Sequence, residues 1–222
     1  MVDIGKWVRD LTQKLWNVFG DRLEFMGLQG SYARGEANEQ SDIDLVVVLD
    51  VLTVDDLRAY RKVVRSMPEA QKACGFICGR EELRRWPVCD LFHLYYDTAP
   101  LCGYLEELLP PICREDAMQA AMIGAANLYH MACHGYLYED RAQTLAQCYK
   151  DAFFVMRALW FAKTGDFIKT HEKLHEMVSP EEQKILERAK AHVNINPRDS
   201  QSIDEAFGEL IEWSGSILER RE

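Results

Sequence analysis

Apolar and polar residues follow two different periods along the first hundred residues, and these periods predict helices and strands in turn. Between residues 4 and 18, apolar side chains recur every three or four positions, which is the period of a helix with one buried face. Asp3 and Gly20 are the predicted N-cap and stop of that helix. Short runs that alternate or are continuously apolar predict strands. The predicted helices lie at 4–18, 53–66 and 81–86, and the predicted strands at 23–29, 44–49, 72–78 and 88–96.

The pattern changes after residue 100, where only helical periodicity continues. Pro110 and Pro111 mark the boundary, because consecutive prolines interrupt regular structure. The predicted helices of this second half lie at 115–137, 141–163, 167–177, 180–192 and 202–219. The predicted fold class is therefore α+β, with a small mixed-sheet domain over 1–109 and an all-helical bundle over 110–222.

Length and composition narrow the class of protein. The chain has 222 residues, of which 48% are hydrophobic and 28% charged, a balance that excludes a disordered or fibrous protein. The longest apolar run, 45–49, is far shorter than the roughly 20 residues of a membrane span. The N-terminus shows no basic stretch followed by an apolar one, so we expect no signal peptide and a cytoplasmic location.

The formal net charge is −10, from 26 basic and 36 acidic residues. Nucleic-acid binders need a basic footprint to meet backbone phosphates, so we expect no nucleic-acid partner. The excess of acid is greater in residues 101–222, which carry 13 basic and 20 acidic residues. This acidic half suits a cationic small molecule or a protein partner, although solubility alone also accounts for it.

The seven cysteines are odd in number and follow no disulfide framework, so free thiols in a reducing compartment are expected. Cys74, Cys78, Cys89 and His93 suggest a metal site at first sight. Their spacing does not match the short paired spacings of zinc sites, and buried cysteines acting as small apolar residues are the preferred interpretation.

One segment, 30–45, carries the residue types of phosphate and metal chemistry. Gly30-Ser31 ends a predicted strand in a tight turn, whose backbone N–H groups and Ser31 hydroxyl can point at an anion. Asp42 and Asp44 flank one apolar residue at the start of the next strand, so the strand period places both carboxylates on one face. Two adjacent carboxylates repel each other, and a divalent cation such as Mg²⁺ relieves the repulsion.

The segment Gly30-Ser31-Tyr32-Ala33-Arg34-Gly35, followed by Ser41-Asp42-Ile43-Asp44-Leu45, resembles the nucleotidyltransferase superfamily of DNA polymerase beta and poly(A) polymerase. It is most similar to the bacterial branch of minimal nucleotidyltransferases and aminoglycoside or lincosamide adenylyltransferases. Ten residues separate Ser31 from Asp42, which fits the family spacing. The resemblance implies two Mg²⁺ ions, ATP as substrate, and a catalytic domain over 1–109.

The family carries a third carboxylate on a later strand, and two residues are candidates for it. Asp90 opens the predicted strand 88–96, as the Asp pair opens its own strand, and would hold metal or act as general base for the acceptor. Asp97 is the alternative, at the far end of the same segment and on its opposite face. Asp90 is preferred, although a solvated carboxylate at a strand end would look the same.

Two cations are candidates for contact with the nucleotide. Arg34 either contacts phosphate or pairs with a carboxylate and holds the shape of the turn, and the second interpretation is slightly favoured. Lys150 lies on a helix of the second half. In similar two-domain adenylyltransferases a lysine of the helical domain reaches the triphosphate, and we place that role at Lys150, where an ordinary solvated lysine is an equal alternative.

The resemblance implies transfer of AMP from ATP to a hydroxyl of a small acceptor, with release of pyrophosphate. An aminoglycoside-like cation is one candidate acceptor, because acidic clefts attract cations. Two alternatives stay open: adenylylation of a protein partner, as in antitoxins of this superfamily, and nucleotide binding without catalysis. The sequence does not decide the acceptor, the base preference or the oligomeric state.

Overall fold

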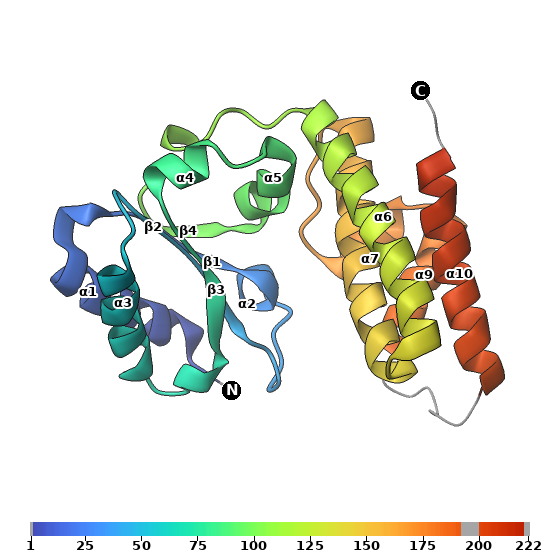
Figure 1. The fold of residues 1–222 in the computed structure, drawn as a ribbon, viewed down its shortest axis with the longest axis horizontal. Helices are drawn as coiled ribbons and strands as arrows, with labels where there is room; N and C mark the ends of the chain where they lie inside the picture. Colours follow the sequence, from blue (N-terminus) through green and yellow to red (C-terminus); the bar gives the residue numbers. More distant parts are fainter. Residues whose placement is uncertain (1, 192–199, 220–222) are drawn as a thin grey trace. The chain divides into compact units, whose positions relative to one another are not determined.

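The computed structural model describes residues 2–191 and 200–219. The chain divides into two compact units, Met1–Pro111 and Ile112–Glu222. The first combines helices with a small sheet and the second is helical (Figure 1). The predicted α+β fold class is thus confirmed.

The first unit begins with the amphipathic helix α1 (Ile4–Phe19), capped as predicted. The Asp3 side chain accepts a hydrogen bond from the Lys6 backbone N–H at 3.0 Å, and Gly20 with φ of 54° ends the helix. The other elements of this unit are β1 (Leu23–Gln29), α2 (Gly30–Arg34), β2 (Ile43–Leu49), α3 (Val54–Arg65), β3 (Ala73–Gly79), α4 (Arg80–Arg84), α5 (Val88–Asp97) and β4 (Ala99–Cys102).

The four strands form one mixed sheet in the order β3-β2-β1-β4. β2 pairs antiparallel with β1 and parallel with β3, so β1 and β2 occupy the centre. The apolar run of β2 from Leu45 to Leu49 follows from that position, because a central strand is covered on both faces. Gln29 at the end of β1 lies opposite Asp44 in β2, which places the end of β1 beside the start of β2.

Strand alternation assigns the two faces of β2. Ile43, Leu45, Val47 and Leu49 pack with α1 and α3 in one apolar core. The intervening residues therefore point to the other face, and Asp44 is among them. Figure 1 shows α1 and α3 on one side of the sheet and α2 and α5 on the other.

The predicted strand 88–96 is wrong: Val88–Asp97 is the helix α5, and the strand follows it as β4. The aromatic residues of this segment favour a strand, but β-propensity is easily overridden by tertiary context. Pro87 stands at the N-cap, where its fixed φ suits a helix start. Four buried apolar residues of α5 pack into the protein, and β4, which contains Pro100, pairs with the free edge of β1.

The second unit consists of α6 (Arg114–Tyr138), α7 (Arg141–Thr164), α8 (His171–Met177), α9 (Pro180–Ala191) and α10 (Ser200–Glu219). The five predicted helices are confirmed, except that α8 begins later than expected and the predicted end at residue 192 lies outside the described residues. In the part of the chain that the structure describes, no helix is long and apolar enough to cross a membrane.

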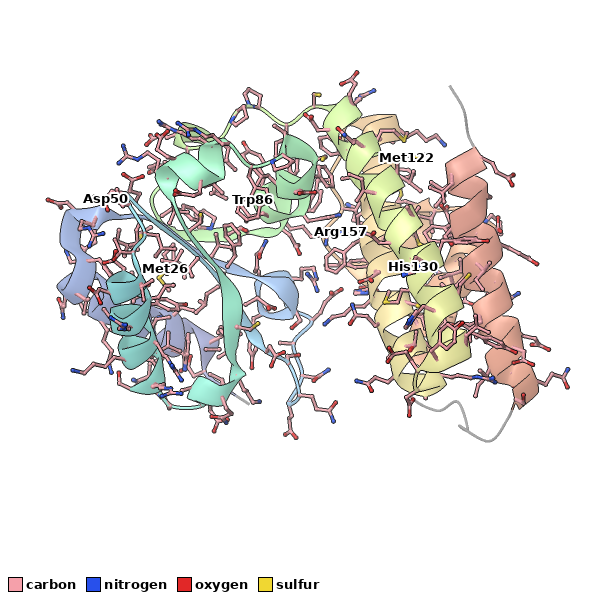
Figure 2. The ribbon with its side chains drawn as sticks, viewed as in Figure 1. Met26, Asp50, Trp86, Met122, His130 and Arg157 are labelled. Atoms are coloured by element: carbon pink, nitrogen blue, oxygen red, sulfur yellow. The ribbon has the colours of Figure 1, made fainter. Side chains whose placement is uncertain are left out.

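The core of the second unit encloses a charged residue that the sequence did not single out. Arg157 on α7, labelled in Figure 2, is fully buried. Its Nε donates to the Ile168 carbonyl oxygen at 2.8 Å, and its guanidinium lies 4.3 Å from the ring centroid of Phe167 and 4.9 Å from that of Phe153. Hydrogen bonding and aromatic faces together make burial of this cation tolerable.

Candidate active site

The turn after β1 is shaped by a glycine that touches a carboxylate. Gly30 has φ of 68°, in the left-handed region that glycine tolerates, and starts the short helix α2. A Cβ atom added at Gly30 would overlap the Asp44 carboxylate. The backbone at Gly30 and the side chain of Asp44 are therefore in direct contact.

The two predicted carboxylates, Asp42 and Asp44, lie at the start of β2. Asp42 is exposed and directly precedes β2, while Asp44 is half-buried within it. The connection leading to them is closed by a tight turn, in which the Asn38 N–H donates to the Ser41 Oγ at 2.9 Å. This turn fixes how the chain enters β2 and hence where Asp42 stands.

Ser31 is half-buried in the first turn of α2, one residue after the glycine contact. Its carbonyl oxygen accepts a hydrogen bond from the Glu36 N–H at 2.8 Å, which closes the turn. Its hydroxyl makes no hydrogen bond to any residue that the structure describes. The structure thus keeps Gly30, Ser31 and Asp44 together, and the Ser31 hydroxyl is available to an incoming ligand.

The parallel neighbour of β2, the strand β3, carries no carboxylate. β3 runs parallel to β2 with Cys74 in register with Asp44, and its sequence, Ala-Cys-Gly-Phe-Ile-Cys-Gly, is uncharged. Cys74 is an exposed free thiol. This neighbour was not predictable from the sequence, because register between strands is set by tertiary pairing.

The prediction that Asp90 opens a strand is wrong, since the residue lies in the first turn of helix α5 and is exposed. It does not open a strand beside the Asp pair. Its role as third carboxylate therefore stays a prediction without support from sheet geometry.

Asp97, the alternative, ends α5 one residue before β4 begins and is buried, with 5% of its side chain exposed. Its Oδ2 atom lies 2.7 Å from Nη1 of Arg34, whose side chain is 8% exposed. Nε of Arg34 also donates to Glu36 Oε2 at 3.0 Å. The prediction that Arg34 pairs with carboxylates is confirmed, and its partner across the sequence is the residue considered for the metal.

Lys150 belongs to the second unit, where it is exposed on α7. It lines a hollow of about 670 Å³ between α6 and α7, together with His130, His134 and Gln147. Figure 2 labels His130 on α6. Lys150 thus lies in a hollow of mixed polar and apolar lining, and its predicted contact with the triphosphate stays a prediction.

The donor set at the end of the sheet fits Mg²⁺ bound together with a substrate. Within residues 2–191 and 200–219, no three His, Cys, Asp or Glu side chains gather as a metal site. Mg²⁺ does not need such a group, because it is commonly held by one or two carboxylates, water and substrate phosphates. Asp42 and Asp44 are the residues that would hold such an ion, and the contact of Asp44 with Gly30 places one of these carboxylates against the turn.

Comparison with known proteins agrees with this geometry. Residues 8–108 match the family model described as "Nucleotidyltransferase domain". No curated protein gives a significant match to the chain.

Solved structures include a similar fold. The spectinomycin adenyltransferase AAD(9) from Enterococcus faecialis, crystallised with ATP and spectinomycin, has a TM-score of 0.59 at 16% identity, over 93% of this chain and 98% of that one. A nucleotidyltransferase-like protein from Exiguobacterium sibiricum has a TM-score of 0.37 at 10% identity, over 95% and 74%. The second score is too low to support an argument, whereas the first shows that the fold is shared across both units.

The turn at Gly30 and the carboxylates Asp42 and Asp44 all lie within the matched residues. Residues 8–108 are therefore similar to the nucleotidyltransferase domain family, and the candidate site lies in the part of the chain that carries this similarity.

Proposed function

We propose that the protein is a Mg²⁺-dependent adenylyltransferase that moves AMP from ATP to a hydroxyl of a small acceptor. The observation that carries the proposal is the contact between Gly30 and the Asp44 carboxylate, with Asp42 two residues away on the same segment. A triphosphate on the turn would lie within reach of metal held by these carboxylates. Such an arrangement neutralises charge at the phosphates, which is the main need of phosphoryl chemistry.

Each residue has a defined role in this proposal. The backbone N–H groups at the start of α2 and the Ser31 hydroxyl donate hydrogen bonds to phosphate oxygens. Asp42 and Asp44 hold Mg²⁺, which supplies positive charge against the triphosphate. The acceptor oxygen attacks the α-phosphorus, and the bond from that phosphorus to the α,β-bridging oxygen breaks. Pyrophosphate leaves with the bonding electrons, and Asp90 is the residue predicted to take the hydroxyl proton.

A small acceptor is favoured over a protein because the similarity to AAD(9) extends through the helical unit as well as the catalytic one. That relative was crystallised with ATP and spectinomycin. The acid excess of residues 101–222 also favours a cationic acceptor, by electrostatic attraction. These points support an amine-bearing, hydroxyl-rich small molecule as the acceptor class.

Transfer of label from α-labelled ATP tests the proposal directly. The protein is incubated with Mg²⁺ and a panel of spectinomycin, aminoglycosides, lincosamides and helical proteins, and both labelled product and pyrophosphate are measured. We expect transfer to a small molecule, loss of activity with EDTA, and a fall of about 10³-fold in Asp42→Asn and Asp44→Asn, since metal charge stabilises the transition state by several kcal/mol.

Asp21→Asn is the matched control, because it removes an exposed carboxylate of the same unit. It should retain full activity. Asp90→Asn tests the predicted base and should lower kcat with little change in KM for ATP. Absence of transfer with all four nucleotides and every acceptor would count against catalysis, and labelling of a protein alone would favour the protein-modifying alternative.

A further inference from the structure

The ion pair between Arg34 and Asp97 joins the phosphate-binding turn to a distant part of the first unit. Arg34 ends α2 and Asp97 ends α5, and the two residues are 63 positions apart in sequence. Both side chains are enclosed, with exposures of 8% and 5%. Helices α2 and α5 are in contact, and this ion pair lies between their ends.

The turn depends on such contacts because it is too short to be stable alone. α2 spans five residues, and isolated helices of this length do not persist in water. Tyr32 anchors it by burial, while Arg34 binds carboxylates on two sides, Glu36 within the turn and Asp97 across from it. Charge-assisted hydrogen bonds of this kind fix the direction of a guanidinium group.

The same contacts make Arg34 unsuited to bind phosphate. Its Nε and Nη1 atoms donate to carboxylates at 3.0 and 2.7 Å, and its side chain is almost completely covered. A triphosphate would have to displace these carboxylates and expose the guanidinium. The positive charge of Arg34 is instead balanced within the protein.

We propose that Asp97 is a positioning residue that acts through Arg34. It holds the turn in the conformation in which Gly30 touches Asp44 and Ser31 meets the triphosphate, and it is not a metal ligand. This inference rests on the proposed function for the part that concerns nucleotide binding. The mechanical part, that Asp97 orders residues 30–36, stands on the ion pair alone.

The position of Asp97 in the sheet explains why it can act on the turn. Only Thr98 separates it from β4, and Ala99 of β4 lies opposite Leu28, two residues before Gly30. The start of β4 and the end of β1 therefore lie at the same end of the sheet as Asp44. Asp97 is close enough to hold the turn while its carboxylate is engaged by Arg34.

Loss of the carboxylate should affect nucleotide binding more than chemistry. The turn contacts phosphates both before and during reaction, so a disordered turn weakens ground state and transition state alike. Such a loss raises KM and leaves kcat largely unchanged. A metal ligand behaves differently, because its removal lowers kcat and raises the Mg²⁺ concentration needed for half-maximal activity.

Asp97→Asn is the main test, with Asp97→Glu as the charge-retaining variant and Asp21→Asn as the control at an exposed carboxylate. Hydrogen exchange of residues 30–36 is followed by mass spectrometry, with α1 as internal reference. Binding of ATP with Mg²⁺ is measured by calorimetry, and KM, kcat and the Mg²⁺ dependence are measured by pyrophosphate release.

In Asp97→Asn we expect exchange at 30–36 to accelerate and the Kd for ATP to rise about tenfold, with kcat changed less than KM. Asp97→Glu should recover part of both, and Asp21→Asn should match the wild type. If Asp97→Asn is too unstable to purify, Asp97→Glu carries the test and should show an intermediate loss.

Two results would overturn the proposal. One is wild-type exchange and wild-type ATP binding in Asp97→Asn. The other is a changed Mg²⁺ dependence at saturating ATP, which would make Asp97 a metal ligand. If the wild-type protein binds no ATP, yet exchange at 30–36 still accelerates in Asp97→Asn, the proposed function fails while the positioning role stands.

Discussion

The two ends of the β1–β2 pair use arginine in different ways. At one end Arg22 precedes β1 and meets Asp50, which follows β2 and is labelled in Figure 2. At the other end Arg34 follows β1 and meets Asp97. Each arginine binds two carboxylates, but Arg22 is 41% exposed and Arg34 only 8%.

The partners explain the difference. Arg22 donates to both oxygens of Asp56, at 2.8 and 3.0 Å, and this carboxylate also forms the capping box of α3 with Thr53. Arg22 thereby neutralises acids that start a helix. The buried Arg34 side chain pairs with Glu36 and Asp97. Asp42, which is close by in the sequence, makes no ion pair within the described residues. The Arg22 end stabilises the fold, whereas the Arg34 end lies beside the carboxylates for which we propose metal binding.

The largest expected effect comes from the contact at the ligand end. Gly30→Ala would push a methyl group into the Asp44 carboxylate, so the turn and the Asp44 side chain could not keep their positions. We expect activity to fall about 100-fold or more, the scale of loss that misplacement of reacting groups causes. Pyrophosphate release with saturating ATP measures it.

Gly20→Ala at the opposite end is the matched control. Gly20 also has a positive φ, of 54°, but a Cβ there meets no atom within 4 Å. It should lower stability by roughly 1–3 kcal/mol through backbone strain, without loss of specific activity in the folded protein. Equal activity losses in both variants would show that strain, rather than contact with Asp44, is responsible.

The second comparison concerns stability. Arg34→Met leaves the buried Asp97 without its partner, and breaking a buried pair in this way costs about 3–5 kcal/mol of unfolding free energy. Arg22→Met should cost less, because solvent reaches its site and can replace the lost interaction. Urea denaturation of both variants measures the two losses in unfolding free energy. A larger loss in Arg22→Met than in Arg34→Met would contradict this prediction.

Acid should affect the Arg22 end through Asp56. Hydrogen bonds from Arg22 and Thr53 hold the pKa of the Asp56 carboxyl well below its usual range. A depressed folded-state pKa contributes stability above the unfolded value of about 3.9, and this contribution is lost as pH falls from about 5 downward. Denaturation at pH 7 and pH 4 should therefore show a smaller pH dependence in Asp56→Asn than in wild type. Identical pH dependence would exclude Asp56 as a source of acid sensitivity.

The smallest effect is a difference in thiol reactivity along β3. Cys74, in register with Asp44, is exposed, whereas Cys78 toward the other end of the strand is buried. Burial raises the pKa of the Cys78 thiol to about 12, so it stays protonated and unreactive at pH 8. Iodoacetamide followed by mass spectrometry should label Cys74 in the folded protein and Cys78 only after denaturation. Labelling of both thiols at similar rates would mean that the sheet opens readily around Cys78.

Local pattern was enough to predict most of the elements and the core of the site. The helix over 4–18, its Asp3 cap, the capping residue Thr53 and the strands around Gly30 and Asp44 all follow from periodicity and short-range chemistry. The contact of Gly30 with Asp44 was predictable because the motif places a turn and a strand start only about a dozen residues apart. Such short connections allow few arrangements.

Contacts between distant residues were not predictable in this way. The segment 88–97 has the composition of a strand, and packing made it the helix α5. Cys74 lies beside Asp44 only because β3 pairs parallel with β2, and Asp97 reaches Arg34 across 63 residues. The sequence by itself determined the turn at Gly30 and the carboxylate pair, because their geometry is local. Tertiary structure decided which side chains surround them, because register and helix packing depend on the whole fold.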